Sequence, residues 1–216
     1  MSDLGKLTYN LDILVYQGDD GIEIKQEAYA RRILREVGLE GYNSTKIAME
    51  FGLTVSKAEK EEKIDPTSYK RNVGCLRYLL HTRPDLVFLV GVTSRYMQSP
   101  RHSHGVIMKQ ILRYLSGTVS YGLKYGRGGS KKIHGFSDSS LNIDPDDGRS
   151  TTGHMFCFGA TPISWCSQQR GTVSLSSCEA EYMAVTEAAK QAIWLQDTLS
   201  EITGKEMEQI TIWIDN

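Results

Sequence analysis

Two aspartates stand where a sheet could bring their carboxylates together. Asp138 follows the stretch GFS, and Asp215 follows the stretch IWI, so each is expected to end a predicted strand. If those strands are neighbours in a mixed sheet, their ends lie side by side, where α/β sheets usually bind ligands. Converging carboxylates repel one another unless a divalent cation joins them. Mg²⁺ prefers oxygen ligands and can stabilise the attacking and leaving oxygens of phosphodiester hydrolysis, so this pattern predicts a magnesium site for such chemistry.

A predicted helix supplies a third carboxylate, and it offers two candidates. Ser176 and Glu179 match a capping box, in which each side chain caps the other residue's backbone N–H. Glu181 lies about 200° around the helix from Glu179. It starts the row expected to pack on the sheet, which is Glu181, Ala184, Ala188, Ala192, Leu195 and Leu199. Glu181 is therefore the predicted ligand, although acids in first helical turns are also common for structural reasons alone.

The charge is nearly balanced overall but unevenly distributed. The 216 residues include 25 basic and 26 acidic side chains, and this nearly neutral total charge excludes a strongly basic nucleic-acid-binding protein. No acidic residue lies between Asp85 and Asp138, however, and that stretch is rich in lysine and arginine. A long one-signed stretch indicates contact with phosphates. The residues predicted to bind nucleic acid are Arg101, Lys109, Arg113, Lys131 and Lys132.

Several other classes of protein are disfavoured. No apolar run approaches the roughly 20 residues that span a bilayer, and the start of the chain lacks a signal-peptide layout. We therefore expect an intracellular protein without a membrane partner. The four cysteines lie far apart with no C-x-x-C pair, so neither a zinc site nor a disulfide framework is indicated.

The elements that must position the carboxylates can be placed by periodicity. The first half reads as a β-hairpin at 8–25, a helix at 26–37, and three helices at 67–80, 84–97 and 101–116. The second half reads as strands at 132–138, 152–158 and 163–167, a long helix at 178–202 and a strand at 209–216. This order predicts an α/β (α+β) chain: a helical module, then a three-stranded antiparallel meander, a long helix and a further strand.

Histidines and tryptophans offer weaker signals. His102 and His104 are expected to cap a helix or face solvent rather than to bind a metal. The three tryptophans, Trp165, Trp194 and Trp213, could stack on bases, but each lies in a segment expected to pack in the core.

Several motifs resemble the Pol polyproteins of copia-type LTR retrotransposons. The strings GFSDSS (135–140), STTGHMFCFG (150–159), ISWCSQQR (163–170), LSSCEAEYMAV (175–185) and IDN (214–216) resemble their RNase H domain. KRNVGCLRYLL (70–80), TRPDLVF (82–88) and LRYLSGT (112–118) resemble the segment that connects reverse transcriptase to RNase H. The opening at 5–34 resembles the end of the reverse transcriptase region.

The resemblance implies three regions: 1–65 from the end of reverse transcriptase, 66–126 as the helical connection, and 127–216 as an incomplete RNase H-like fold. It implies Mg²⁺-dependent hydrolysis of RNA in RNA–DNA hybrids, with Asp138, Glu181 and Asp215 as catalytic metal ligands. By the same resemblance the protein is expected in cytoplasmic virus-like particles or in the nucleus.

The resemblance also has gaps. The polymerase aspartate pair has no counterpart, and the family's fourth acidic ligand would lie beyond Asn216, so we expect weak or lost hydrolysis. The alternative is a non-catalytic, nucleic-acid-binding remnant of a decayed element. A small-molecule α/β enzyme lacks support, because no Gly-rich fingerprint or nucleophile is present.

Overall fold

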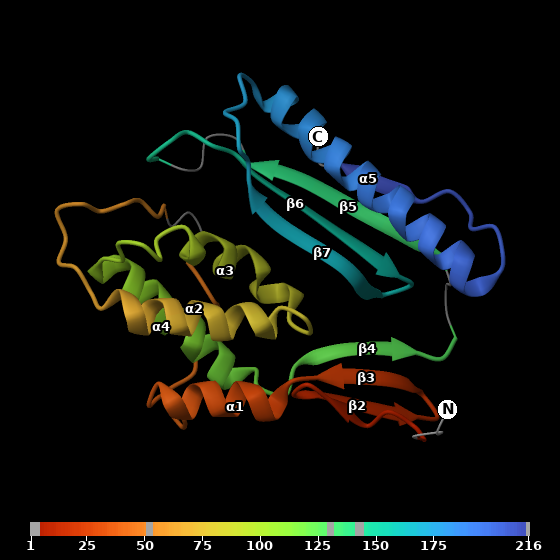
Figure 1. Cartoon of the computed structure of the whole chain (residues 1–216), viewed down its shortest axis with the longest axis horizontal. Helices are drawn as coiled ribbons and strands as arrows, with labels where there is room; N and C mark the ends of the chain where they lie inside the picture. Colours follow the sequence, from red (N-terminus) through yellow and green to blue (C-terminus); the bar gives the residue numbers. More distant parts are fainter. Residues whose placement is uncertain (1–4, 51–53, 129–131, 141–144, 215–216) are drawn as a thin grey trace. The chain divides into compact units, whose positions relative to one another are not determined.

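The chain forms two compact units, Met1–Arg127 and Gly128–Asn216 (Figure 1). The computed structural model describes residues 5–50, 54–128, 132–140 and 145–214. Each unit has its own sheet and its own buried apolar cluster. The units are therefore described separately.

The sheet of the first unit joins both ends of that unit. Its strands are β1 (Tyr9–Asn10), β2 (Ile13–Gly18), β3 (Gly21–Lys25) and β4 (Gly122–Gly126), and neighbours pair in that order, all antiparallel. The first strand of the β-hairpin expected at 8–25 is interrupted, because Leu11 and Asp12 have positive φ angles of 47° and 62° and form a turn. β4 was not predicted from the sequence.

The helices of the first unit follow the predicted pattern closely. They are α1 (Glu27–Glu36), α2 (Pro66–Leu79), a 3₁₀ turn η1 (Pro84–Leu86), α3 (Val87–Ser94) and α4 (His102–Gly117). Pro66 and Pro84 each occupy a first helical position, where the missing N–H is not needed. Asp65 caps α2 by accepting hydrogen bonds from the backbone N–H groups of Thr67 and Ser68, each at 3.0 Å. Val73, Leu76, Leu86, Ile111 and Leu115 are fully buried between these helices.

Residues 1–65 and 66–126 share one core, although they are expected to correspond to different regions of the polyprotein. β3 pairs with β4, and Tyr29 of α1 donates a hydrogen bond to the carbonyl oxygen of Cys75 on α2 at 3.3 Å. Separate origins for these regions stay a prediction. In the structure they fold as a single unit.

One helical position carries a residue that weakens its helix without a structural reason. Gly74 is exposed in the middle of α2, and a β-carbon built there would meet no atom within 4 Å. We expect Gly74→Ala to raise the free energy of unfolding by about 0.5–1 kcal/mol, because glycine loses more backbone entropy in a helix. Urea denaturation followed by circular dichroism would measure it. Gly135→Ala is the contrasting variant, because its β-carbon would lie 2.4 Å from the Phe156 ring and should destabilise the protein.

The second unit has the predicted order of elements. β5 (Ile133–Ser140), β6 (Thr151–Phe158) and β7 (Thr161–Gln169) form an antiparallel meander, and α5 (Ser177–Thr203) leads to β8 (Thr211–Ile214). The order across the sheet is β7-β6-β5-β8, with β8 parallel to β5. This mixed α/β arrangement confirms the predicted fold class and is consistent with a partial RNase H-like fold.

The core of the second unit lies between α5 and the sheet (Figure 1). Phe156 is fully buried against Ala188, Ala192 and Leu195 of α5. Gly135, opposite Phe156 on β5, leaves room for the aromatic ring. The small residues Ala188 and Ala192 let α5 approach the sheet closely.

No helix in the described residues combines the length and apolar character required to cross a membrane.

Candidate active site

The parallel pair β5–β8 joins the two strands that precede the aspartates in the sequence. The described register runs from His134 opposite Thr211 to Ser137 opposite Ile214. Asp138 and Asp215 are the residues that directly follow this last pair. Asp215 itself lies outside the described residues. The expectation that the strands before the two aspartates would be neighbours is confirmed.

Asp138 lies within β5 rather than at its end. The strand continues to Ser140, and Asp138 is opposite Gly153 of β6. Its exposed side chain accepts a hydrogen bond at Oδ1 from the backbone N–H of Ser139 at 2.7 Å. Because side chains alternate along a strand, Asp138 is on the exposed face of the sheet with Phe136, whereas Ser137 is on the buried face.

Glu179 has a structural role at the start of α5. Ser176 accepts a hydrogen bond from the Glu179 backbone N–H at 3.1 Å, as the capping box predicts. The Glu179 carboxylate instead accepts a hydrogen bond from the backbone N–H of Leu175 at 2.7 Å, one residue earlier than predicted. Glu179 is therefore engaged in capping the helix.

Glu181 begins the buried row of α5. Ala184, Ala188, Ala192 and Leu195 are all buried, so the predicted sheet-facing row is confirmed. Glu181 is half-buried, and its Oε2 atom is buried. Among the residues that the structure describes, no three histidine, cysteine, aspartate or glutamate side chains gather closely enough to hold a metal ion. The predicted trio includes Asp215, so its convergence stays a prediction.

The residues predicted to bind nucleic acid are divided between the two units. Arg101 and Arg113 donate hydrogen bonds to the carbonyl oxygens of Glu61 (2.9 Å) and Asn43 (2.8 Å). The Lys109 ammonium lies 5.7 Å from the centre of the Tyr42 ring. Arg101 is the N-cap of α4, and Lys109 and Arg113 lie one turn apart along the helix.

Of the two lysines in the second unit that are predicted to bind nucleic acid, the structure describes one. Lys132 is exposed and forms an ion pair with Glu208 at 2.8 Å, and this hydrogen bond raises the pKa of the ammonium group. Lys131 lies outside the described residues.

Two interpretations of single residues can now be judged. His104 is buried and accepts a hydrogen bond at Nδ1 from the Arg101 backbone N–H at 2.9 Å, so the expected capping role is confirmed. The expectation that Trp194 and Trp213 are core residues is wrong, because their side chains are 57% and 59% exposed. Trp194 lies on the outer side of α5, and Trp213 lies on the exposed face of the sheet beside its register partner Phe136.

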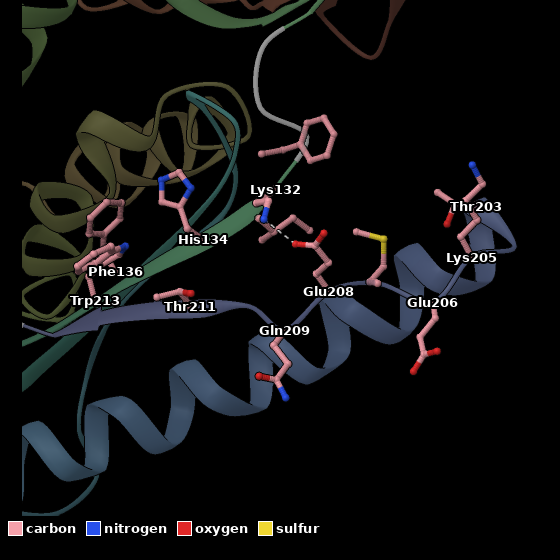
Figure 2. Close-up of a pocket in the computed structure, with 13 residues that line it drawn as sticks. Lys132, His134, Phe136, Thr203, Lys205, Glu206, Glu208, Gln209, Thr211 and Trp213 are labelled. Carbon is pink, nitrogen blue, oxygen red and sulfur yellow. Dashed lines mark ion pairs between the residues drawn. The ribbon is translucent and has the colours of Figure 1, made fainter.

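A hollow of about 1200 Å³ lies beside the start of β5 (Figure 2). Figure 2 shows Trp213, Phe136 and His134 at one side, and the Lys132–Glu208 ion pair at its centre. The residues that line it are Lys132, Ile133, His134, Phe136, Phe158, Thr203, Lys205, Glu206, Met207, Glu208, Gln209, Thr211 and Trp213. Alternation in the sequence indicates the aromatic side of this hollow. His134 and Phe136 alternate with buried residues on β5, and Thr211 and Trp213 alternate with isoleucines on β8.

Comparison with known proteins finds relatives that match nearly the whole chain. No protein-family model matches it, and no solved structure matches it. The retrovirus-related Pol polyprotein from transposon RE2 of Arabidopsis thaliana is 34% identical over 212 residues, which are 97% of this chain and 14% of that protein. The Pol polyprotein from transposon TNT 1-94 of Nicotiana tabacum is 34% identical over 89% of this chain and 15% of its own length.

A shorter relative matches over most of its length. An uncharacterized mitochondrial protein of Arabidopsis thaliana is 33% identical, covering 90% of this chain and 80% of that protein. The chain therefore spans about one-seventh of the length of the Pol polyproteins and most of the shorter relative.

Proposed function

Because this chain belongs to the family of copia-type retrotransposon Pol polyproteins, we propose that residues 127–216 supply the metal ligands of an RNase H-like active site. Its reaction is hydrolysis of the RNA strand in an RNA–DNA hybrid. The observation that carries the proposal is the parallel pairing of β5 with β8, because the two aspartates directly follow its last described pair. If the two aspartates had only separate structural roles, the strands before them would not need to pair with each other.

The donors fit a hard divalent cation. Asp138, Glu181 and Asp215 offer only carboxylate oxygens, which Mg²⁺ prefers. Asp138 presents an exposed carboxylate, and Glu181 comes from the first turns of the helix that covers the sheet. Bound Mg²⁺ would activate the attacking water and stabilise the leaving oxygen. The protein's part is to hold the carboxylates at fixed positions on a strand and a helix, since rigid elements position a site better than loops.

The cations support binding of the substrate. Arg101, Lys109, Arg113, Lys131 and Lys132 are proposed to contact phosphates, which releases counterions and makes affinity fall with salt. If these contacts persist without hydrolysis, the protein is the non-catalytic nucleic-acid-binding remnant that forms the second candidate. A virus-like particle in the cytoplasm, or the nucleus, is the proposed location.

The proposal is tested by cleavage of a labelled RNA–DNA hybrid in Mg²⁺. Three chains are compared: this chain, this chain extended by the segment that follows the matched region in the RE2 relative, and the extended chain with Asp138→Asn. We expect weak or no cleavage, clear cleavage and no cleavage, respectively, because a two-ion site needs enough carboxylates to hold both ions.

An extended chain that binds the hybrid without cleaving it would favour the non-catalytic remnant. Cleavage that survives Asp138→Asn would contradict the proposed site. Cleavage by the unextended chain that disappears with Asp138→Asn would show that three acids suffice.

A further inference from the structure

The exposed side of α2 carries positive charge only. Lys70, Arg71 and Arg77 are exposed, and no acidic residue occurs from Pro66 to Pro84. Among the described residues, no carboxylate lies within 4.0 Å of these three cations. By contrast, Arg31, Arg32 and Arg35 of α1 each pair with an acid. The α2 cations thus leave their charge available to an external anion.

The cations share a face with the exposed glycine. Helical spacing places Lys70, Gly74 and Arg77 within about 60° of one another, with Arg71 at the flank. Lys70 and Arg77 are about 10.5 Å apart along the helix axis, with Gly74 between them. A β-carbon at Gly74 would contact nothing in this chain, and no positive φ requires glycine there. A glycine that no internal contact explains leaves space for the close approach of something outside the chain.

We propose that this face, defined by Lys70, Arg71, Gly74 and Arg77, binds the phosphate backbone of a nucleic-acid duplex. The cations would contact phosphates, and Gly74 would let the backbone lie against the helix. The inference extends the proposed function, and it rests on that function only in taking nucleic acid as the partner. These residues lie in the motif KRNVGCLRYLL (70–80), but none of them is among those predicted from the sequence to bind nucleic acid, because that prediction rests on the acid-free stretch after Asp85.

A duplex fits this face better than an acidic peptide does. Peptide recognition generally uses apolar pockets or grooves to anchor side chains. None of the large exposed apolar side chains of the described residues belongs to α2. Sequence-independent binding to a phosphate backbone requires no such anchor, because cations and close approach suffice.

The test is the salt dependence of binding, measured by fluorescence anisotropy with a labelled 20-bp RNA–DNA hybrid in EDTA. In a plot of log affinity against log salt concentration, the combined variant Lys70→Gln, Arg71→Gln, Arg77→Gln should reduce the steepness of the slope by about 2.7, at roughly 0.9 per lost phosphate contact. The matched control is Arg31→Gln, Arg32→Gln, Arg35→Gln on α1, which removes the same charge from a face that is already paired. The control should leave the slope nearly unchanged.

A second variant tests the close approach without changing charge. Gly74→Leu should lower affinity for the hybrid by about tenfold, roughly the effect of losing one hydrogen bond to a charged group. Circular dichroism should show that the helix is kept. Unchanged affinity in Gly74→Leu would overturn the role of the glycine.

Equal slopes in the α1 and α2 variants would overturn the binding face itself. Polyglutamate that binds the wild type as tightly as the hybrid does, and loses binding in the α2 variant, would assign the face to acidic peptides instead. Since EDTA prevents cleavage, these results are independent of whether the proposed hydrolysis occurs.

Discussion

Replacing Glu181 by glutamine in the extended chain is expected to reduce Mg²⁺-dependent hybrid cleavage by at least about 100-fold. Glutamine keeps the size of the side chain but removes the negative charge that would hold a cation. Glu181 has a buried carboxylate oxygen and begins the row of α5 that faces the sheet. In the proposed site it is the helical ligand that completes the pair of aspartates.

Glu179→Gln is the matched control, two residues away on the same helix. The Glu179 carboxylate accepts a hydrogen bond from the backbone N–H of Leu175, and the amide oxygen of glutamine can accept the same bond, so Glu179→Gln should lower the free energy of unfolding by less than about 1 kcal/mol and leave cleavage within about threefold. Single-turnover cleavage and urea denaturation of both variants separate the two roles. Loss of cleavage in Glu179→Gln, with activity kept in Glu181→Gln, would contradict the assignment.

Arg83→Ala is expected to destabilise the first unit by about 3 kcal/mol, because it removes the centre of a buried polar network. Arg83 is 2% exposed and donates hydrogen bonds to both Asp85 carboxylate oxygens, at 2.9 and 2.7 Å. It also donates to the carbonyl and hydroxyl oxygens of Thr118, each at 2.8 Å. Tyr114 donates to the same carboxylate at 3.0 Å, and burial, followed by the charge of Asp85, raises the pKa of Tyr114.

The measurement is urea denaturation followed by circular dichroism. Arg83→Lys should recover little, because one ammonium group cannot reproduce the planar set of guanidinium donors. Arg35→Ala is the control: its pair with Glu40 is exposed on both sides and is worth at most about 1 kcal/mol. Equal losses in Arg83→Ala and Arg35→Ala would show that the buried network adds nothing beyond a surface pair.

Local patterns predicted the elements whose structure depends on local contacts. The sheet-facing row of α5 could be predicted because its apolar positions repeat every three or four residues. Ser176, a typical N-cap residue, indicated where the helix begins. The β6–β7 hairpin could be predicted because Gly159 and Ala160 form a two-residue turn between two segments with strand character. The choice of Glu181 over Glu179 as the residue on the sheet-facing row followed from the same helical geometry.

Structural features that depend on residues far away in the sequence could not be predicted from local patterns. β4 carries no strong strand signal of its own and is a strand because β3, about one hundred residues earlier, pairs with it. Trp213 appeared to be a core residue because it lies in an apolar strand, but its face of the sheet is open. Asp138 appeared to end its strand because polar residues follow it, yet Ser139 and Ser140 extend the ladder opposite β6.

The parallel pairing of β5 with β8 also implies an order of assembly. Every described pair between these strands joins residues 77 positions apart, whereas the last pair of β5 with β6 joins residues only 11 apart. Short-range pairs close first because their loops cost less entropy. During synthesis the meander can therefore form while α5 is still emerging, and β8 joins last. Until β8 pairs with β5, the backbone edge of β5 can pair with an extended strand of another chain. Pairing of β8 with this edge is therefore the folding step most exposed to aggregation.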